Sequence, residues 1–226
     1  MGKAAAAAAR TIGVLLFLLG SLFSDVKVEA QMPIPAKIDG FVYKGAPVWG
    51  KSVVVEAFFD PLCPDSRDSW PPLKQALLHY PDRISVVVHP FPLPYHNSAF
   101  IAARALHIAN KLNSSSTYPL LELLFKFQEG YYDEQTYNLT RASVVGGIAK
   151  LAVAAVGKHS LSSFLSGFDD PATDSATRIS FKYGCSRAVT GTPYFFVNGV
   201  PLSQSGSALG YKKWRSILDP LLEKRN

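Results

Sequence analysis

The stretch FFDPLCPDSRDSW, residues 58–70, decides the fold, because a strand-like apolar run leads directly into a cysteine at the expected start of a helix. The run SVVVEAFF at 52–59 is β-branched and aromatic, which is typical of a buried strand. After Cys63, apolar residues recur at helical spacing and predict a helix over residues 66–80. The cysteine therefore stands at a junction between strand and helix.

Two prolines, Pro71 and Pro72, stand inside the expected helix. Proline removes a backbone donor, so we expect the pair to kink or restart the helix. Pro64 is different, because its missing N–H group would have no helical partner in a first turn.

The chemistry of Cys63 depends on forming a thiolate. The start of a helix favours a thiolate and lowers the pKa of a thiol there. The carboxylate of Asp65 opposes this effect, and Arg67 offsets part of that opposition. We expect a moderately reactive sulfur that is exposed at the junction and is not a strong oxidant.

Ser66 lies one helical turn after Cys63, where a Cys-x-x-Cys redox site would have its second cysteine. Serine cannot attack a mixed disulfide, but its hydroxyl can donate a hydrogen bond to the Cys63 thiolate. The competing interpretation is that Cys63 is a buried or bridged structural cysteine.

The rest of the chain alternates between strand and helix patterns. A second buried strand is predicted over 83–91, and Asn198-Gly199 is a hairpin signal. The order is strand, helix, strand, a helical block, then a hairpin and a helix, which predicts an α/β core with a helical insertion. The expected helices cover 97–112, 118–128, 141–157, 160–166, 174–183 and 210–224.

FFDPLCPDS followed far downstream by GTPYFFVNG (191–199) resembles the thioredoxin superfamily, and its DsbA-like branch in particular. The likeness covers residues 35–223. It implies an α/β, thioredoxin-like fold in one domain, 31–226, with an inserted helical domain at about 95–185. The core would comprise about 35–94 and 186–226.

The resemblance also implies a cis bond between Thr192 and Pro193, in a loop that faces Cys63. The backbone of Thr192 would pair with an extended substrate, and Pro193 would keep a backbone N–H away from the thiolate. Pro64, Thr192 and Pro193 are thus the candidate substrate-binding residues. Without the resemblance, Pro193 would be a turn proline that opens an edge strand.

This chain departs from the family pattern at Ser66, which replaces the resolving cysteine. We therefore expect thiol–disulfide exchange through Cys63 alone, with glutathione or a partner thiol as the second nucleophile and no other cofactor. The expected partners are protein or peptide thiols and disulfides. The alternative is a non-catalytic module that holds an extended peptide or partner protein in the same groove.

Cys185 is the second cysteine of the chain. We expect it to be buried and inert, with a bridge to Cys63 or a regulatory thiol as alternatives. His96 precedes a helix and is expected to supply polarity there, or to tune the thiol. His89 falls in a strand and is expected to pack in the core.

Residues 1–30 resemble a signal peptide, with Lys3 and Arg10 before an apolar run at 12–23 that is too short to span a bilayer. We expect a protein of the secretory pathway, extracellular or in an endomembrane lumen, without a membrane span after signal removal. An organelle transit peptide is the alternative. Sequons at Asn113 and Asn138 are the expected glycosylation acceptors.

Two classes of binding are not expected. The net charge of +6 is spread along the chain without a sustained basic patch, which argues against nucleic acid binding. The histidines have no metal-ligand spacing with one another or with the cysteines, so no metal is predicted.

Overall fold

The computed structural model describes residues 35, 37–43, 53–157, 160–203 and 206–223. The expected signal peptide lies outside the described residues. No helix within the described part of the chain is long and apolar enough to cross a membrane.

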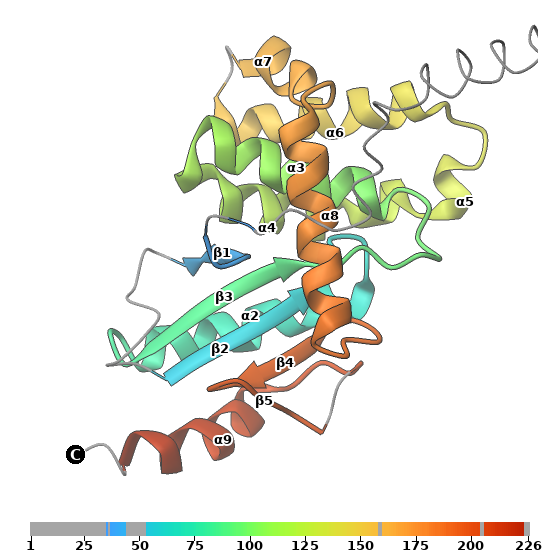
Figure 1. Cartoon of the computed structure of the whole chain (residues 1–226). Helices are drawn as coiled ribbons and strands as arrows, with labels where there is room; N and C mark the ends of the chain where they lie inside the picture. The colour runs from blue at the N-terminus through green and yellow to red at the C-terminus, as the bar shows by residue number, and fades with distance from the viewer. Residues whose placement is uncertain (1–34, 36, 44–52, 158–159, 204–205, 224–226) are drawn as a thin grey trace, which may run out of the picture. The chain divides into compact units, whose positions relative to one another are not determined.

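The described strands form one mixed five-stranded sheet (Figure 1). β2 is parallel to β3, whereas β4 pairs with β2 in the antiparallel direction and β1 is antiparallel to β3. The sheet order is β1-β3-β2-β4-β5. The strand bounds are β1 (Phe41–Val42), β2 (Val53–Phe59), β3 (Ile84–Pro90), β4 (Tyr194–Val197) and β5 (Val200–Pro201).

β2 is the central strand, and its side chains are buried on both faces of the sheet. Successive side chains of a strand point to opposite faces. Val55 and Phe59 accordingly belong to the main core, whereas Phe58 packs in a second cluster that contains Cys63. The apolar run that predicted this strand thus positions the candidate thiol as well as the sheet.

Helices cover the sheet and continue into a helical block (Figure 1). α2 (Pro64–His79) packs against α9 (Tyr211–Glu223) and β3, while α8 (Pro171–Ser186) packs on β3 and α3. The other described helical segments, all between β3 and β4 in sequence, are α3 (Ala99–Leu112), η2 (Ser114–Ser116), α4 (Thr117–Phe127), η3 (Gln128–Tyr131), α5 (Asp133–Thr136), α6 (Arg141–Val156) and α7 (Leu161–Ser166).

This architecture confirms the predicted α/β, thioredoxin-like fold with a helical insertion. The predicted hairpin is also present, since Asn198 and Gly199 have positive φ angles between β4 and β5. The side chain of Asn198 accepts a hydrogen bond from the backbone N–H of Val54 at 2.9 Å, which ties the hairpin to β2.

The expected restart of α2 at Pro71 and Pro72 is wrong, because one helix runs through both prolines. Tertiary contacts on either side of them hold the helix. Trp70 and Leu73 are buried, and the indole N–H of Trp70 donates to Glu122 on α4 at 2.9 Å.

Candidate active site

Cys63 is the N-cap residue of α2, at the predicted junction between strand and helix. Its backbone is extended, with φ −84° and ψ 124°, and Pro64 begins the helix. The first-turn N–H groups of a helix lack helical partners, and the Cys63 side chain makes no capping hydrogen bond to them. The sulfur is therefore attached where the helix dipole favours negative charge.

The side chain of Cys63 is nevertheless buried, with only 4% of the residue exposed. The prediction of an exposed sulfur is wrong. Cys63 packs in an apolar cluster with Phe58, Leu93, Val189 and Phe196. Leu93, Val189 and Phe196 come from segments other than β2 and α2, so the sequence next to the cysteine gives no sign of this packing.

The loop before β4 lies against the sulfur. The Thr192–Pro193 bond is cis, and the Cys63 thiol donates a hydrogen bond to the backbone carbonyl of Thr192 at 3.5 Å. These residues are 129 positions apart in the chain. A thiolate has no proton to donate, so deprotonation of Cys63 would release this carbonyl for another donor.

Ser66 does not contact the sulfur as predicted. Its side chain is fully buried, and its hydroxyl oxygen accepts the backbone N–H of Asp60 at 3.3 Å. The expected hydrogen bond to the Cys63 thiolate is absent between these two described residues. Ser66 instead links the first turn of α2 to Asp60, which begins the active-site turn (residues 60–63).

Asp60 organises this turn, although the sequence patterns above did not mark it. The buried carboxylate accepts the backbone N–H of Leu62 at 2.8 Å and that of Leu93 at 3.0 Å. The carbonyl of Asp60 accepts the N–H of Cys63 at 3.1 Å. The Asp-Pro pair before the cysteine was a turn signal that could have identified this residue.

Gln128 holds the same turn from the helical insertion. Its side chain is fully buried, and its amide nitrogen donates to the carbonyls of Pro61 at 3.2 Å and Cys63 at 3.3 Å. The amide oxygen accepts the hydroxyl of Tyr132 at 2.8 Å. No local signal marked Gln128, because its two partners in the turn, Pro61 and Cys63, lie more than 60 residues away.

His96 stands just before a helix, as expected, and it also contacts the turn that holds Cys63. Its Nδ1 is 2.7 Å from the Asp60 carboxylate. This hydrogen bond raises the pKa of His96, and burial opposes the rise only in part. Below that pKa an imidazolium therefore stands beside the active-site turn.

A buried charge network lies behind the site, on the α8 side of β2. Glu56 accepts hydrogen bonds from Tyr183 at 3.0 Å and Arg187 at 3.1 Å, and its carboxylate is 3.6 Å from Nε2 of His89. Burial favours the neutral form of Glu56, but His89 and Arg187 more than offset this effect, and its pKa falls to about 2. His89 is buried as predicted, but it also pairs with Asp39 at 2.8 Å.

Two cavities border the site, and His96 lines both of them. One has a volume of about 290 Å³ and includes Leu62 and Pro64, which flank the cysteine. The other has a volume of about 490 Å³ and includes Leu93. The site therefore has room for an extended ligand on the side of His96.

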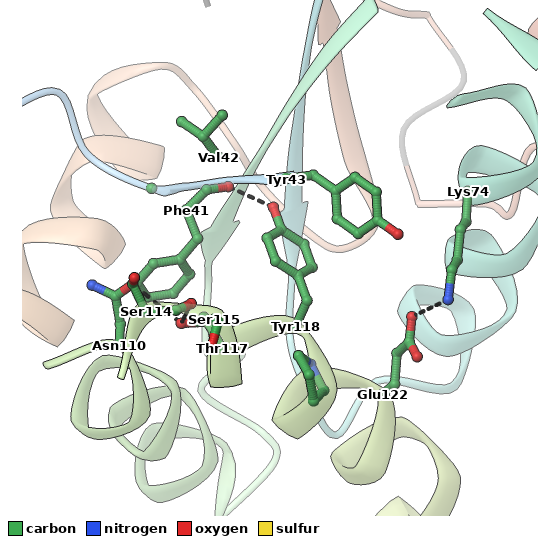
Figure 2. Close-up of a pocket in the computed structure, with 12 residues that line it drawn as sticks. Phe41, Val42, Tyr43, Lys74, Asn110, Ser114, Ser115, Thr117, Tyr118 and Glu122 are labelled. Atoms are coloured by element: carbon green, nitrogen blue, oxygen red, sulfur yellow. Dashed lines mark hydrogen bonds and ion pairs between the residues drawn. The ribbon is translucent and has the colours of Figure 1, made fainter. Parts of the chain in front are cut away.

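A larger cavity of about 710 Å³ is shown in Figure 2. It lies between β1 and the start of α4, next to the ion pair of Lys74 and Glu122 at 2.6 Å. Tyr118 donates to the carbonyl of Phe41 across one part of it. Cys63 does not line this cavity, so its size alone does not make it the candidate active site.

Cys185 is exposed, and neither it nor Cys63 forms a disulfide. The expectation of a buried, inert cysteine is wrong, and the alternative bridge to Cys63 is absent. Asn113 and Asn138 are both exposed, as glycosylation requires. Within the described residues, no group of three metal-ligating side chains could hold an ion.

In comparisons by sequence, no protein-family model and no curated protein matches this chain. Comparisons by structure find similar folds. The catalytic domain of Proteus mirabilis ScsC is 18% identical with a TM-score of 0.58, over 82% of this chain and 89% of that one. A periplasmic thioredoxin-like protein from Salmonella enterica serovar Typhimurium is also 18% identical, with a TM-score of 0.59, over 81% and 90% of the two chains.

A third similar structure is the thiol-disulfide exchange protein alpha-DsbA2 from Wolbachia pipientis. It is 15% identical with a TM-score of 0.60, over 80% of this chain and 87% of that chain. At these identities the likeness establishes the thioredoxin-like fold, and it leaves the chemistry to be argued from the residues of this chain.

Proposed function

We propose that this protein carries out thiol–disulfide exchange through Cys63 as its single reactive thiol. The observation that carries the proposal is the sulfur at the N-cap of α2, 3.5 Å from the carbonyl of Thr192 in the cis-proline loop. The name of the Wolbachia neighbour as a thiol-disulfide exchange protein supports the same chemistry.

The reaction has two displacement steps. The Cys63 thiolate attacks one sulfur of a substrate disulfide, forms a mixed disulfide and releases the other sulfur as a thiolate. A second thiolate, from glutathione or a partner protein, then attacks the substrate sulfur of the mixed disulfide. The Cys63 thiolate is restored, and the substrate leaves as a disulfide with the second thiol.

The neighbours of Cys63 have separate roles in this proposal. Pro64 starts α2 beside the sulfur, while Thr192 offers its carbonyl to the backbone of an extended substrate, and Pro193 presents no N–H to the thiolate. Ser66 positions the turn through Asp60 and neither resolves the mixed disulfide nor bonds the sulfur.

Turnover with glutathione tests the proposal. The native protein should reduce a small mixed disulfide at a rate that depends on glutathione concentration, and Cys63→Ser should remove this activity. The matched control is Cys185→Ser, which should retain it. Equal activity in native protein and Cys63→Ser would refute the proposal.

Ser66→Cys provides a second test, because position 66 lies one turn from Cys63. A cysteine there could attack the mixed disulfide, so the variant should release both substrate thiols in one turnover without glutathione and end as an intramolecular disulfide, which dithiothreitol would reduce for further turnovers. A folded variant that gains no such activity would count against a catalytic scaffold.

The second candidate function is a non-catalytic peptide-binding module. The burial of Cys63 favours it, because a cysteine residue that is 4% exposed gives reagents little access to its sulfur. This candidate predicts that Cys63 in the folded protein resists alkylation while Cys185, which is exposed, reacts.

We infer that the protein works in the secretory pathway, where disulfides persist. The signal-like residues 1–30 support this inference, as does the naming of one structural neighbour as periplasmic. Expression with and without residues 1–30 tests it: secretion and a change in mass at Asn113 or Asn138 should require this segment.

A further inference from the structure

The two cavities beside the candidate active site have opposite chemistry. The first, here called the acidic pocket, combines carboxylates with aromatic rings. The second, here called the basic pocket, combines cations with aromatic rings. The side chains used below are Tyr131, Tyr132, Asp133 and Glu134 in the acidic pocket, and Phe100, Arg178, Phe181 and Lys182 in the basic pocket.

The acidic pocket suits a cationic side chain. Asp133 accepts the backbone N–H of Asn97 at 2.8 Å and is held in place by it. Glu134 is exposed and makes no hydrogen bond or ion pair with any residue that the structure describes. Two carboxylates next to tyrosine rings can hold a lysine or arginine by ion pairing and by cation–π contact.

The basic pocket suits an acidic side chain with an apolar neighbour. Phe100 and Phe181 are both partly exposed and supply apolar surface. Arg178 lies over the Phe100 ring at 5.5 Å and pairs with Asp174, while Lys182 has no such partner among the described residues. Lys182 therefore presents an uncompensated charge to a ligand.

Both pockets adjoin the turn that holds the thiol. Leu62 and Pro64, on either side of Cys63, line the acidic pocket. Leu93 packs in the same cluster as Cys63 and lines the basic pocket. Cys63 itself lines neither pocket, but His96 belongs to both, so a chain that passes over His96 next to the turn would reach each pocket.

We propose that these pockets select a protein substrate by the charges that flank its reactive cysteine. An extended substrate segment crosses His96, with a lysine or arginine in the acidic pocket and an aspartate or glutamate in the basic pocket. This inference rests on the proposed function and names the class of substrate: a disulfide-bonded segment with opposite charges on its two sides.

Peptides with activated disulfides test the selection in a Cys185→Ser background. Two peptides carry a central cysteine as its mixed disulfide with thionitrobenzoate. One peptide has lysine before and glutamate after the cysteine, and the other has the reverse order. The Cys63 thiolate forms a disulfide with the peptide sulfur and expels the coloured thionitrobenzoate anion, so each rate is measured directly.

One peptide should react faster than the other by about tenfold at low salt, at about threefold for each charge. The difference should shrink in high salt, because salt screens exposed charges. Glu134→Lys and Lys182→Glu should each reduce the ratio, and the double variant should invert it. Lys213→Glu, on α9 and outside both pockets, is the control and should leave the ratio unchanged.

Equal rates for the two peptides would overturn the inference. It would also be overturned if Glu134→Lys and Lys182→Glu changed the ratio of the two rates no more than Lys213→Glu does. Failure of the proposed function has a different signature, namely no release of thionitrobenzoate from either peptide. In that case, fluorescence anisotropy measures the affinities of the same two peptides with serine in place of the cysteine. One peptide that binds more tightly than the other, by a ratio that Glu134→Lys and Lys182→Glu reduce, upholds the charge selection, and equal affinities refute it.

Discussion

At the scale of single residues, the turn before α2 is set by partners from distant parts of the chain. Asp60 accepts the N–H of Leu62 within the turn and that of Leu93 beyond β3. Gln128 donates to two carbonyls of the turn from the helical insertion. Buried polar groups are costly without partners, so these contacts both stabilise the turn and fix the direction of the Cys63 side chain.

Gln128→Leu should lower the free energy of unfolding by about 1–3 kcal/mol, because it leaves the buried carbonyl of Pro61 without its donor. It should also slow the reaction of Cys63 with a disulfide, since the turn loses both hydrogen bonds from the Gln128 amide and the Cys63 side chain is less well positioned. Denaturant unfolding and the rate of thionitrobenzoate release measure the two effects. The control is Gln135→Leu, at an exposed position of α5; equal losses in both variants would contradict the role of Gln128.

Glu56 gives a prediction for acid stability. Its pKa is lowered to about 2 in the folded protein, from about 4.5. The folded state therefore gains stability from ionised Glu56 above pH 4.5 and loses it as the pH falls toward 2, by about 3 kcal/mol in total. The free energy of unfolding should fall less steeply between pH 4.5 and 2 in Glu56→Gln. Identical slopes in the two proteins would show that Glu56 does not make this contribution.

At the scale of elements, hydrophobic spacing and turn residues predicted the strands, the hairpin and most helices. The cap of α6 shows why such predictions succeed: the Thr140 side chain accepts the N–H of Ser143, which is a local contact. The expected restart of α2 did not occur, because Pro71 and Pro72 act locally while the packing of Trp70 against α4 is tertiary. The helix expected over 118–128 included Gln128 but not the rest of η3, so the 3-10 turn that begins at Gln128 was not predicted.

The approach of α8 to the sheet depends on Gly184. A Cβ atom there would lie 2.5 Å from the Phe91 ring and 3.3 Å from that of Phe58, both in the cluster around Cys63. Gly184→Ala should therefore destabilise the fold by about 1–3 kcal/mol through overpacking, although alanine favours a helix.

Gly146→Ala in α6 is the matched control, because its added Cβ would meet nothing within 4 Å. It should stabilise the protein by about 0.5–1 kcal/mol, from helix propensity alone. Thermal and denaturant unfolding of both variants measure the difference. A stabilising effect at both positions would refute the close contact at Gly184.

At the scale of the whole molecule, the resemblance to DsbA-like proteins predicted that Cys63 and Thr192 meet, although 129 residues separate them. From the sequence, the burial of Cys63 was only the competing interpretation, because it depends on Leu93, Val189 and Phe196 closing around the residue. The sequence did not predict the pairs of His96 with Asp60 and of Glu56 with Arg187, because no periodic pattern links such distant residues.

The distribution of charge around the site also depends on the whole fold. The chain has a net charge of +6, yet Asp133 and Glu134 bring acidic side chains to one side of His96. Arg178 and Lys182, from α8, bring cations to the other side. A net charge read from sequence therefore gives no guide to the substrate.

The order in which the two cysteines react is the most direct test of the account. The native protein is mixed with a substoichiometric amount of an uncharged thionitrobenzoate peptide, and peptide mapping finds which sulfur carries the peptide at the earliest times. The account predicts Cys63, although it is 4% exposed while Cys185 is exposed. Peptide found on Cys185 alone, with Cys63 unmodified until the protein unfolds, would contradict it.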